Sequence, residues 1–533
     1  MSAITVILDD GSRHEIDASD ATATRTLAGY LEAHGFPLNT RCGKRGICCG
    51  CEVELSDGST VKSCQIAAMG VQSVNIPGRS RMDHQPQVGE TFRIDIPTAH
   101  QPIFESVEGV RDTAFAIDLG TTTVVVMLID LTTGDILARA GGFNEQIRFG
   151  DNVLTRIDAA RDPAILNDLQ AAVTKATFPP LIASACERAG RSPGRLAGGV
   201  IAGNTTMLHL LVGEDPTPLG IAPFTPRFIA GRQLTCADIR LAIDGLNTPL
   251  PIHLLPGIAA FIGSDIVAGI YATGMMYDQQ PSLLVDIGTN GEIVLQHEGQ
   301  LTTCATAAGP AFEGGGLRCG TRARDGAISR LELTLDPCQI EAEIIGDIPL
   351  SRAAGVCGSA YIDFLAEARE AGLLTTSGRF DPSRWNSLPA SHRVEDDDER
   401  ALRLAGQDGR GGMVVSEVDI AVILQAKAAI GAGIDILLEA SGIEADQVGK
   451  VYLAGGFGMH LDVSHAIEIG LLPGFNTEQV EVVGNTSLAG AMLATIDKST
   501  FKEMEEIRTH TRVIELNSQE GFEDCYIDHL MLP

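Results

Sequence analysis

A strand, an aspartate, a Gly-Thr loop and a second strand occur twice along this chain. The two copies read FAIDLGTTTVVVMLID (115–130) and LLVDIGTNGEIVLQH (283–297), with Asp118 and Asp286 at the same place in each. A supersecondary unit that repeats within one chain indicates structurally related parts. We therefore expect two lobes, at approximately 113–280 and 281–533.

Each copy has the pattern of a phosphate-binding turn. Backbone N–H groups of a Gly-Thr-Thr-Thr segment can surround a phosphate, and an aspartate at the end of the preceding buried strand can hold Mg²⁺, usually through water. A single such loop also occurs in purely structural β-hairpins. Two copies in repeated lobes favour the functional interpretation, in which a nucleotide is gripped between the lobes.

A third segment, Val451–Gly458, is an apolar strand that ends in consecutive glycines (VYLAGGFG). This pattern is compatible with a close-packed turn between a strand and a helix. It is equally the pattern of a flat backbone surface against adenine. The two phosphate loops favour the adenine surface.

Together the three segments resemble the acetate kinase–sugar kinase–Hsp70–actin (ASKHA) superfamily. The resemblance implies a two-lobed α/β actin-like (RNase H-like) ATPase domain in residues 113–533, with ATP and Mg²⁺ as cofactors. It assigns the first phosphate loop to Asp118, Gly120, Thr121, Thr122 and Thr123. It assigns the second loop to Asp286, Gly288, Thr289, Asn290 and Gly291, and the adenosine contacts to Gly455, Gly456 and Phe457. Asp118 and Asp286 would organise Mg²⁺ and the attacking water.

Five of the twelve cysteines lie within residues 42–64. Clustering of this kind favours metal binding over disulfides in a chain with no secretion signal. Cys42, Cys48, Cys51 and Cys64 have the spacing C-x5-C-x2-C-x12-C. Plant-type [2Fe–2S] ferredoxins use C-x4-C-x2-C and a distant fourth cysteine, so the first gap here is one residue longer. We predict a [2Fe–2S] cluster on these four thiolates, with Cys49 as a bystander or a substitute for Cys48.

A structural zinc site is the alternative for the same cysteines. Zinc sites of this type are commonly built from two close pairs of ligands. Only one C-x2-C pair is present, because Cys64 has no close partner in the sequence. The pattern therefore favours the cluster over zinc.

The residues around the cysteines predict a small α+β domain. The expected elements follow the order of a β-grasp fold: a hairpin over 3–9 and 13–17, a helix over Thr26–His34, a strand over Glu52–Leu55, and further strands that end near Thr91–Ile96. We therefore expect a β-grasp [2Fe–2S] ferredoxin-like domain in residues 1–96. Residues 97–112 would form a linker to the ATPase domain.

Further segments resemble the reductive activators of corrinoid-dependent methyltransferase systems, in which a ferredoxin domain precedes an ASKHA domain. These segments are GNTTMLHLLVG (203–213), LLPGIAAFIGSDIVAG (254–269), AAGPAFEGGG (307–316), GVCGSAYID (355–363), LQAKAAIGAGI (424–434) and GNTSLAGA (484–491). The resemblance covers essentially the whole chain. Some members carry an additional middle domain after a long linker, and the short separation here predicts that such a domain is reduced or absent.

The resemblance implies ATP-dependent reductive activation of a corrinoid protein. One electron would pass from the [2Fe–2S] cluster to Co(II), giving Co(I), and ATP binding or hydrolysis would drive the transfer. The implied partners are a corrinoid (cobalamin-binding) protein of a methyltransferase system and an upstream electron donor. Glu313, in a Gly-rich loop, would assist at the ATPase site, although a helix-capping or loop-structuring role is an equal alternative.

Two other functions stay open. An ASKHA-type small-molecule kinase with a fused iron–sulfur domain would phosphorylate an added alcohol or carboxylate and would not need Cys48. An ATP-gated binding module would show no electron flow. A flavin-dependent reductase is disfavoured, because no G-x-G-x-x-G segment follows a strand with an acidic residue about 20 positions on.

Charge and apolar patterning exclude further classes. A net charge of −30 argues against a nucleic-acid-binding protein, which would need a basic face. The start of the chain lacks a basic and then apolar segment, and no uninterrupted run of about 18 apolar residues occurs, so we expect a cytoplasmic protein that does not span a membrane. A homodimer is expected only from base rates. Residues 376–412, rich in Ser, Asp, Arg and Gly, are expected to form a surface excursion.

Overall fold

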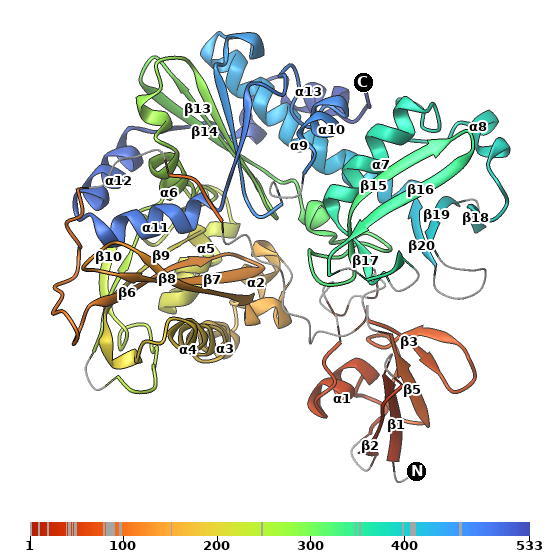
Figure 1. Ribbon diagram of the computed structural model, residues 1–533, viewed down its shortest axis with the longest axis horizontal. Coiled ribbons are helices and arrows are strands. Elements are labelled where there is room, and N and C mark those ends of the chain that lie inside the picture. The colour runs from red at the N-terminus through yellow and green to blue at the C-terminus, as the bar shows by residue number, and fades with distance from the viewer. Residues whose placement is uncertain are drawn as a thin grey trace. The chain divides into compact units, whose positions relative to one another are not determined.

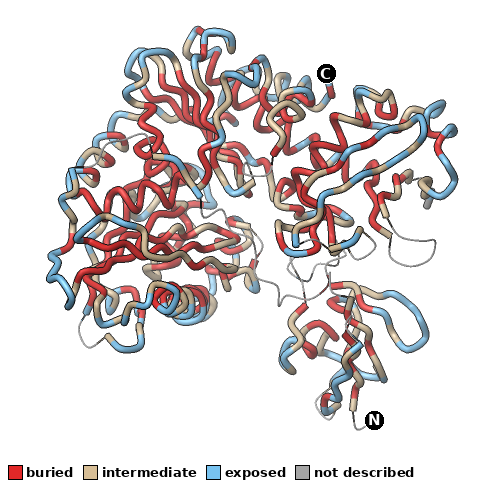
Figure 2. The backbone as a smooth tube through the Cα atoms, viewed as in Figure 1, coloured by how far each residue is buried: buried red, intermediate tan, exposed pale blue. Residues whose placement is uncertain are grey.

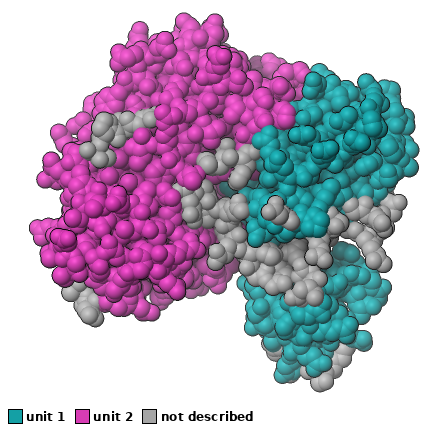
Figure 3. All heavy atoms as spheres, viewed as in Figure 1, with its two compact units in different colours: residues 1–85, 313–375, 379–423 teal, residues 86–312, 376–378, 424–533 magenta. Residues whose placement is uncertain are grey.

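A computed structural model describes most of the chain, namely residues 3–8, 11–18, 21–38, 40, 44, 46, 51–77, 80, 91–94, 99–150, 152–246, 249–346, 348–350, 353–396, 399–405, 412–457 and 461–533. These residues belong to two compact units (Figure 3). Unit 1 comprises residues 1–85, 313–375 and 379–423, and unit 2 comprises residues 86–312, 376–378 and 424–533.

The N-terminal part of unit 1 is a mixed five-stranded sheet with one helix (Figure 1). Its elements are β1 (Ala3–Leu8), β2 (Arg13–Asp17), α1 (Leu27–Ala33), β3 (Glu52–Leu55), β4 (Thr60–Lys62) and β5 (Ser73–Ile76). The strand order is β2-β1-β5-β3-β4, with β1 antiparallel to β2 and parallel to β5. Ile4, Val6 and Leu8 are all buried, as the period of two along a half-buried strand requires. The predicted hairpin, helix and strand over 52–55 are confirmed.

The remainder of unit 1 contains two three-stranded sheets, β16-β15-β17 and β18-β19-β20. Its elements are β15 (Ala327–Leu335), β16 (Cys338–Ile344), β17 (Gly355–Val356), α7 (Gly358–Glu370), α8 (Pro382–Ser387), β18 (Arg393–Asp396), β19 (Glu399–Ala405) and β20 (Met413–Ser416). Helix α7 packs against β15.

The expectation of a surface excursion at 376–412 is wrong over the described part of that segment. Trp385 on α8 is fully buried, and its ring lies 4.6 Å from that of Phe380. The indole Nε1 donates to Oε1 of Glu395 on β18 at 2.7 Å. Polar composition suggested a loop, but the two large aromatic rings bury enough apolar surface to hold α8 and the β18–β19 hairpin together.

Unit 2 contains two six-stranded sheets, β10-β11-β9-β6-β7-β8 and β22-β21-β12-β13-β14-β23 (Figure 1). They share a five-stranded core, and the sixth strand lies at opposite edges, with β10 beyond β11 and β23 beyond β14. The strands of the first sheet are β6 (Thr113–Leu119), β7 (Thr123–Asp130), β8 (Ile136–Phe143), β9 (Leu196–Gly203), β10 (Arg232–Thr235) and β11 (Pro251–Leu254). Those of the second are β12 (Ser282–Ile287), β13 (Gly291–His297), β14 (Gln300–Thr306), β21 (Lys450–Ala454), β22 (Val480–Gly484) and β23 (Arg512–Val513).

In both sheets the repeated segment supplies the first two strands of an antiparallel trio, β6-β7-β8 or β12-β13-β14. The first strand of each trio also pairs in parallel with a later strand, β9 or β21. A further parallel strand, β11 or β22, lies beyond it. The central strands β6, β7, β9, β12, β13 and β21 are largely buried (Figure 2). The predicted internal repeat is therefore confirmed by the topology.

The helices of unit 2 cover these sheets. They are α2 (Val153–Ala159), α3 (Pro163–Ala171), α4 (Phe178–Arg188), α5 (Thr205–Val212), α6 (Ser264–Thr273), α10 (Val463–Glu468), α11 (Thr486–Ile496), α12 (Ser499–His510), α13 (Phe522–Asp528) and the long α9 (Glu417–Ser441), which begins in unit 1. Helices α6 and α11 approach very closely: a Cβ on Gly490 would lie 2.5 Å from the Cα of Ala268. Helix α11 follows β22 of the second sheet and packs against β6 of the first, so it brings the end of one repeat to the beginning of the other.

Residues 91–93, which we expected at the end of the N-terminal domain, pair instead with the second sheet of unit 2. Phe92 forms a bridge with Gly484, and the Arg93 N–H donates to the Val483 carbonyl at 3.1 Å. Strand β22 is the outermost strand of its sheet, so its free edge can accept this segment. The expected linker is packed as well, with Phe104 buried among the core residues of unit 2. The domain boundaries at 96, 112 and 280 stay predictions.

Helix α9 is long and apolar enough, by length and composition alone, to cross a membrane. Its sequence contains no uninterrupted run of about 18 apolar residues, because charged residues such as Lys427 and Asp435 interrupt it. Within the protein, 78% of the apolar window is buried. That burial is typical of a core helix.

Candidate functional site

Asp118 and Asp286 occupy equivalent positions in the two sheets of unit 2. Asp118 on β6 pairs across the parallel ladder with Ala202 on β9, and Asp286 on β12 pairs with Ala454 on β21. Both aspartates lie next to the last residue of their strand, directly before the Gly-Thr loop. The structure therefore brings each predicted loop to the carboxyl end of a central strand, where α/β sheets commonly bind ligands.

Asp118 is held by the N-terminus of α11. Its Oδ2 accepts from Nδ2 of Asn485 at 2.8 Å, and its Oδ1 accepts from the Ser487 hydroxyl at 2.7 Å. Asn485 is the N-cap of α11, and its own Oδ1 accepts from the Leu488 N–H. This cap leaves the amide NH₂ group directed at Asp118. The GNTSLAGA segment thus supplies two polar contacts that sequence reasoning did not assign.

Two further carboxylates, Asp265 and Glu292, interact with the two predicted aspartates. Burial, together with repulsion from Asp118, raises the pKa of Asp286 to about 7. Burial and the charges of Asp286 and Asp118 raise the pKa of Asp265 to about 7. Burial also raises the pKa of Glu292 far above its usual range, and Asp265 and Asp286 add to the effect. A group of mutually repelling carboxylates favours a cation, because a nearby positive charge stabilises the ionised forms.

Sequence reasoning missed Asp265 and Glu292 for different reasons. Asp265 lies at the start of α6, in the segment 254–269, which indicated a resemblance to the activator family but no particular role for this residue. Glu292 is the charged residue of the buried strand β13 and is 9% exposed. A lone carboxylate in a buried strand is a signal of function that the sequence offered, since such a group is rarely buried without a partner.

The first phosphate loop is braced by polar side chains from three directions. Asn144 donates to the Gly120 carbonyl at 2.9 Å, and the fully buried Arg156 donates to the Thr121 carbonyl. Asn204, the N-cap of α5, donates to the Thr121 hydroxyl at 2.9 Å. The Gly120 N–H also donates to the Thr123 carbonyl at 3.0 Å. Together these contacts fix the conformation of the first loop.

The second phosphate loop lies against the glycines of the third motif. The Gly288 N–H donates to the Asn290 carbonyl at 2.9 Å, which closes a tight turn. Gly455 follows β21 with φ +93°, and a Cβ there would lie 2.8 Å from Oδ1 of Asp286. The second and third predicted segments therefore meet at Gly455, and the first is close enough for the charge of Asp118 to act on Asp286.

The residues predicted at adenosine differ in their surroundings. A Cβ on Gly456 would have nothing within 4 Å, whereas the ring of Phe457 lies 5.0 Å from that of Phe312. Gly458, the last glycine of the motif, lies outside the described residues. The open space at Gly456 and the paired rings are compatible with an aromatic base against this segment. The adenosine assignment stays a prediction.

Replacing Gly455 by alanine should impair both stability and the site. The new methyl group would lie 2.5 Å from the Ile287 carbonyl oxygen, and the positive φ already disfavours any side chain. We expect a loss of about 1–3 kcal/mol in the free energy of unfolding. Urea unfolding of Gly455→Ala and of Gly456→Ala checks this, because the neighbouring methyl group meets open space. Equal losses in the two variants would contradict the assignment of Gly455.

Glu313 lies in unit 1, at the end of a 3-10 turn over Pro310–Glu313. Its Oε2 accepts from Nε of Arg322 at 3.2 Å, and both side chains are 19% exposed. This contact favours the loop-structuring alternative. The predicted assisting role of Glu313 stays a prediction.

Cys51 and Cys64 lie together in the core of the N-terminal sheet, 0% and 3% exposed. Burial raises the pKa of the Cys51 thiol to about 11, and Cys64 interacts with it. Neither forms a disulfide. The buried Cys51 thiol therefore stays protonated unless a metal centre stabilises the thiolate. Cys42, Cys48 and Cys49 lie outside the described residues.

Lys44 and Gly46, which lie between Cys42 and Cys48 in the sequence, are anchored near Cys64. Gln65 donates to the Cys64 sulfur at 3.4 Å and to the Lys44 carbonyl at 2.7 Å. Lys62 donates to the Gly46 carbonyl at 2.8 Å. A Cβ on Gly46 would lie 2.7 Å from Cδ of Gln65. These contacts tie residues 44 and 46 to the end of the sheet that holds Cys51 and Cys64.

Comparison with known proteins decides the family. Residues 113–278 match the family model described as the RACo middle region, and residues 280–533 match the one described as the C-terminal domain of RACo, the ASKHA domain. The corrinoid activation enzyme RamQ of Eubacterium limosum is 32% identical over 429 residues, which cover 78% of this chain and 70% of that protein. The chain belongs to the family of reductive activators of corrinoid proteins.

Two further members of this activator family are similar. The [Co(II) methylated amine-specific corrinoid protein] reductase of Methanosarcina barkeri is 27% identical over 415 residues, covering 74% of this chain and 71% of that protein. The solved structure of a reductive activator for corrinoid, iron–sulfur protein superposes with a TM-score of 0.74 at 27% identity, covering 99% of this chain and 98% of that one. The ASKHA-type fold of the large domain is thereby shown.

The expectation that a middle domain is reduced or absent is wrong. The middle region of the activator family matches residues 113–278, which carry the first six-stranded sheet. The short separation between the N-terminal domain and Thr113 therefore does not reflect a missing domain. It reflects the fact that the middle region is itself the first copy of the repeat.

The carboxylates of this activator should make its stability depend on pH. In an unfolded chain an aspartate titrates near pH 4, whereas the folded pKa of both Asp265 and Asp286 is about 7. The folded state binds more protons between these values, so stability is full below about pH 4 and is lost as the pH rises through about 7.

We therefore expect the melting temperature of magnesium-free protein to fall between about pH 5 and pH 8, and Mg²⁺ to restore more of it at pH 8 than at pH 6. Scanning calorimetry of the wild type and of Asp286→Asn measures this. The variant should show a shallower dependence, because the amide does not titrate. Identical pH profiles for the two proteins would contradict the expectation.

Proposed function

We propose that this protein carries out ATP-dependent reductive activation of a corrinoid protein, by transfer of one electron from a [2Fe–2S] cluster to Co(II), giving Co(I). The cluster loses the electron that the cobalt gains, and an upstream donor must return it. The observation that carries the proposal is that one chain holds two sites. One is the buried thiol pair of the N-terminal sheet, and the other is the group of carboxylates on the two repeated sheets, which favours a bound cation. Membership of the activator family supports it.

The N-terminal part is proposed to be a β-grasp [2Fe–2S] ferredoxin-like domain, with Cys42, Cys48, Cys51 and Cys64 as ligands. The mixed sheet with a single helix supports the fold, and the buried pair of Cys51 and Cys64 supports the donor set. When bound, the cluster supplies a one-electron carrier of low potential, near −400 mV for plant-type ligation. Gln65 and Lys62 contact Lys44 and Gly46, which lie between the proposed ligands Cys42 and Cys48 in the sequence.

The second part of the proposal is a Mg-ATP site in unit 2. Asp118 and Asp286 are proposed to hold Mg²⁺ through water and to orient the attacking water, with Asp265 and Glu292 adding negative charge around them. Asn485 and Ser487 fix the orientation of the Asp118 carboxylate. The two Gly-Thr loops would bind the phosphates, and Gly455 to Phe457 the adenosine.

ATP is needed because the Co(II)/Co(I) couple is expected to lie below the potential of the cluster, which makes the transfer uphill. A nucleotide can drive such a step only if it binds two states of the activator–corrinoid complex with different affinity. The open and closed forms of the two lobes around the proposed nucleotide site would be these two states. The partner is a corrinoid protein, and we propose that the complex works in the cytoplasm.

An anaerobic assay tests the proposal. Reduced protein is mixed with a Co(II) corrinoid protein of a methyltransferase system, and the absorbance of Co(I) is followed with Mg-ATP, with a non-hydrolysable analogue and without nucleotide. We expect Co(I) to accumulate only with Mg-ATP. Phosphorylation of an added alcohol or carboxylate without formation of Co(I) would support a kinase and overturn the proposal.

A further inference from the structure

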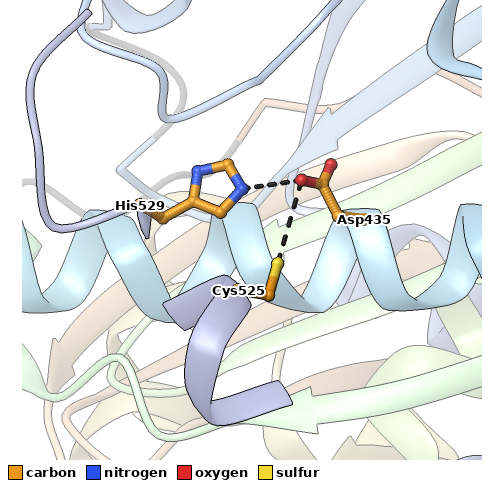
Figure 4. A group of neighbouring side chains, drawn as sticks. All are labelled: Asp435, Cys525 and His529. Carbon is orange, nitrogen blue, oxygen red and sulfur yellow. Dashed lines mark hydrogen bonds and ion pairs between the residues drawn. The ribbon is translucent and has the colours of Figure 1, made fainter. Parts of the chain in front are cut away.

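Three side chains with metal-binding atoms meet at the C-terminal end of the chain, within unit 2 (Figure 4). Nε2 of His529 lies 2.7 Å from Oδ2 of Asp435, and Sγ of Cys525 lies 3.9 Å from the same oxygen. The three donor atoms all lie within 4.8 Å of one another. None of these residues takes part in the carboxylate group or the thiol pair described above.

The positions of the three donors follow from helix geometry. Cys525 lies on α13 and His529 is its C-cap, so their spacing of four residues places them on the same face of one turn. Asp435 lies on α9, and Figure 4 shows its carboxylate reaching toward both. A Cβ on Gly431, one turn before Asp435, would lie 2.7 Å from Nδ1 of His529. The missing side chain of Gly431 makes room for the imidazole ring.

The electrostatic surroundings of the thiol are negative. Burial raises the pKa of Cys525 to about 11, and Asp435, Asp528 and Glu439 add to the effect. No salt bridge to a lysine or arginine is formed by Asp435 in the described part of unit 2. A thiol, an imidazole and a carboxylate in such a setting attract a divalent cation.

We propose that Cys525, His529 and Asp435 form a zinc site that fastens α13 to α9. Thiolate, imidazole and carboxylate are the donors zinc uses most, at about 2.3 Å for sulfur and about 2.0–2.2 Å for nitrogen and oxygen. In a tetrahedral site with these bond lengths, the donor atoms lie about 3.3–3.6 Å apart. In the structure, Oδ2 of Asp435 lies 2.7 Å from Nε2 of His529, which is shorter, and 3.9 Å from Sγ of Cys525, which is longer. Small side-chain movements therefore complete three corners of the tetrahedron, and water takes the fourth.

The charges of the proposed site balance. Zinc displaces the thiol proton of Cys525, which leaves to solvent, and the thiolate and the Asp435 carboxylate together neutralise Zn²⁺. His529 binds through the lone pair of Nε2, with its remaining proton on Nδ1. Asp435 is 45% exposed in its side chain, so solvent reaches the fourth position. The alternative is a simple His–Asp ion pair, which needs neither the thiol nor a metal.

Zinc retention by the full-length, cluster-loaded protein tests the proposal. Chelator-treated protein is incubated anaerobically with zinc chloride and desalted, and the retained zinc is measured by elemental analysis. We expect about one zinc per wild-type chain, and at least ~10-fold weaker binding in Cys525→Ser and His529→Gln. Gly431→Ala keeps all three donors but pushes the imidazole aside, and should weaken binding as well. Cys236→Ser and His510→Gln, at a cysteine and a histidine elsewhere in unit 2, are the matched controls and should retain wild-type zinc.

The zinc K-edge spectrum of the wild type gives a second measurement that needs no variant. One sulfur and three nitrogen or oxygen neighbours are expected. A shell of three or four sulfurs would place the metal on the N-terminal cysteines and overturn the proposal. Absence of retained zinc, or equal retention in the site variants and the controls, would overturn it too.

Discussion

Cys51→Ser should abolish reduction of the corrinoid protein while leaving ATP turnover intact. Cys51 is fully buried beside Cys64 in the core of the N-terminal sheet. A serine hydroxyl in that position cannot replace a thiolate ligand, so the cluster should be lost or assembled incompletely. We expect the rate of Co(I) formation to fall to below about one per cent of wild type, because electron transfer needs the intact cluster.

Visible absorbance and electron paramagnetic resonance of the reduced protein measure cluster content, and phosphate release measures ATP turnover. Cys338→Ser is the matched control, because Cys338 is a partly buried cysteine of the same unit on β16. It should leave the cluster and the rate unchanged. Wild-type formation of Co(I) by Cys51→Ser would remove Cys51 from the ligand set. Loss of both activities with a lowered melting temperature would instead indicate misfolding.

Asp286→Asn should have the opposite effect, with a full cluster and no ATP-driven turnover. The carboxylate of Asp286 lies at the point where the second phosphate loop meets Gly455, and three other carboxylates crowd around it. An amide of the same shape keeps the packing but removes the charge that a metal needs. We expect ATP hydrolysis to fall by about 10²–10³-fold, the range for loss of one preorganised electrostatic group.

Isothermal titration of Mg-ATP separates binding from hydrolysis, and cluster absorbance confirms that unit 1 is intact. Asp135→Asn is the matched control, because Asp135 is an exposed aspartate in the turn after β7. It should hydrolyse ATP at the wild-type rate. Hydrolysis by Asp286→Asn at more than about half the wild-type rate would exclude a metal-organising role. Together the two variants separate the electron path from the energy source.

Much of the fold could be predicted from local patterns. The Asp-x-Gly-Thr segments occur between two apolar strands, and hydrophobic periodicity with glycine turns is a short-range signal. The same holds for the N-terminal hairpin and helix, and for the spacing of Cys51 and Cys64. Residues 376–412 were misjudged because composition alone does not reveal that Trp385 and Phe380 pack together.

The candidate site was predicted only in part, for the same physical reason. Asp118 and Asp286 could be found because each lies in a recognisable local motif. Asn485 contacts Asp118 from 367 positions away in the chain, and no local periodicity encodes such a contact. The packing of α11 against β6 brings the two residues together.

The sequence by itself determined the repeat, the cysteine spacing and the three loops, because each is a pattern of neighbouring residues. The tertiary structure decided which carboxylates act together, what braces the first loop, where residues 91–93 pair, and that Cys525, His529 and Asp435 meet. These are contacts between segments distant in the chain, formed when the sheets and helices bury their apolar faces against one another. Side chains brought together in that way change one another's pKa and metal affinity, and no single segment carries that information.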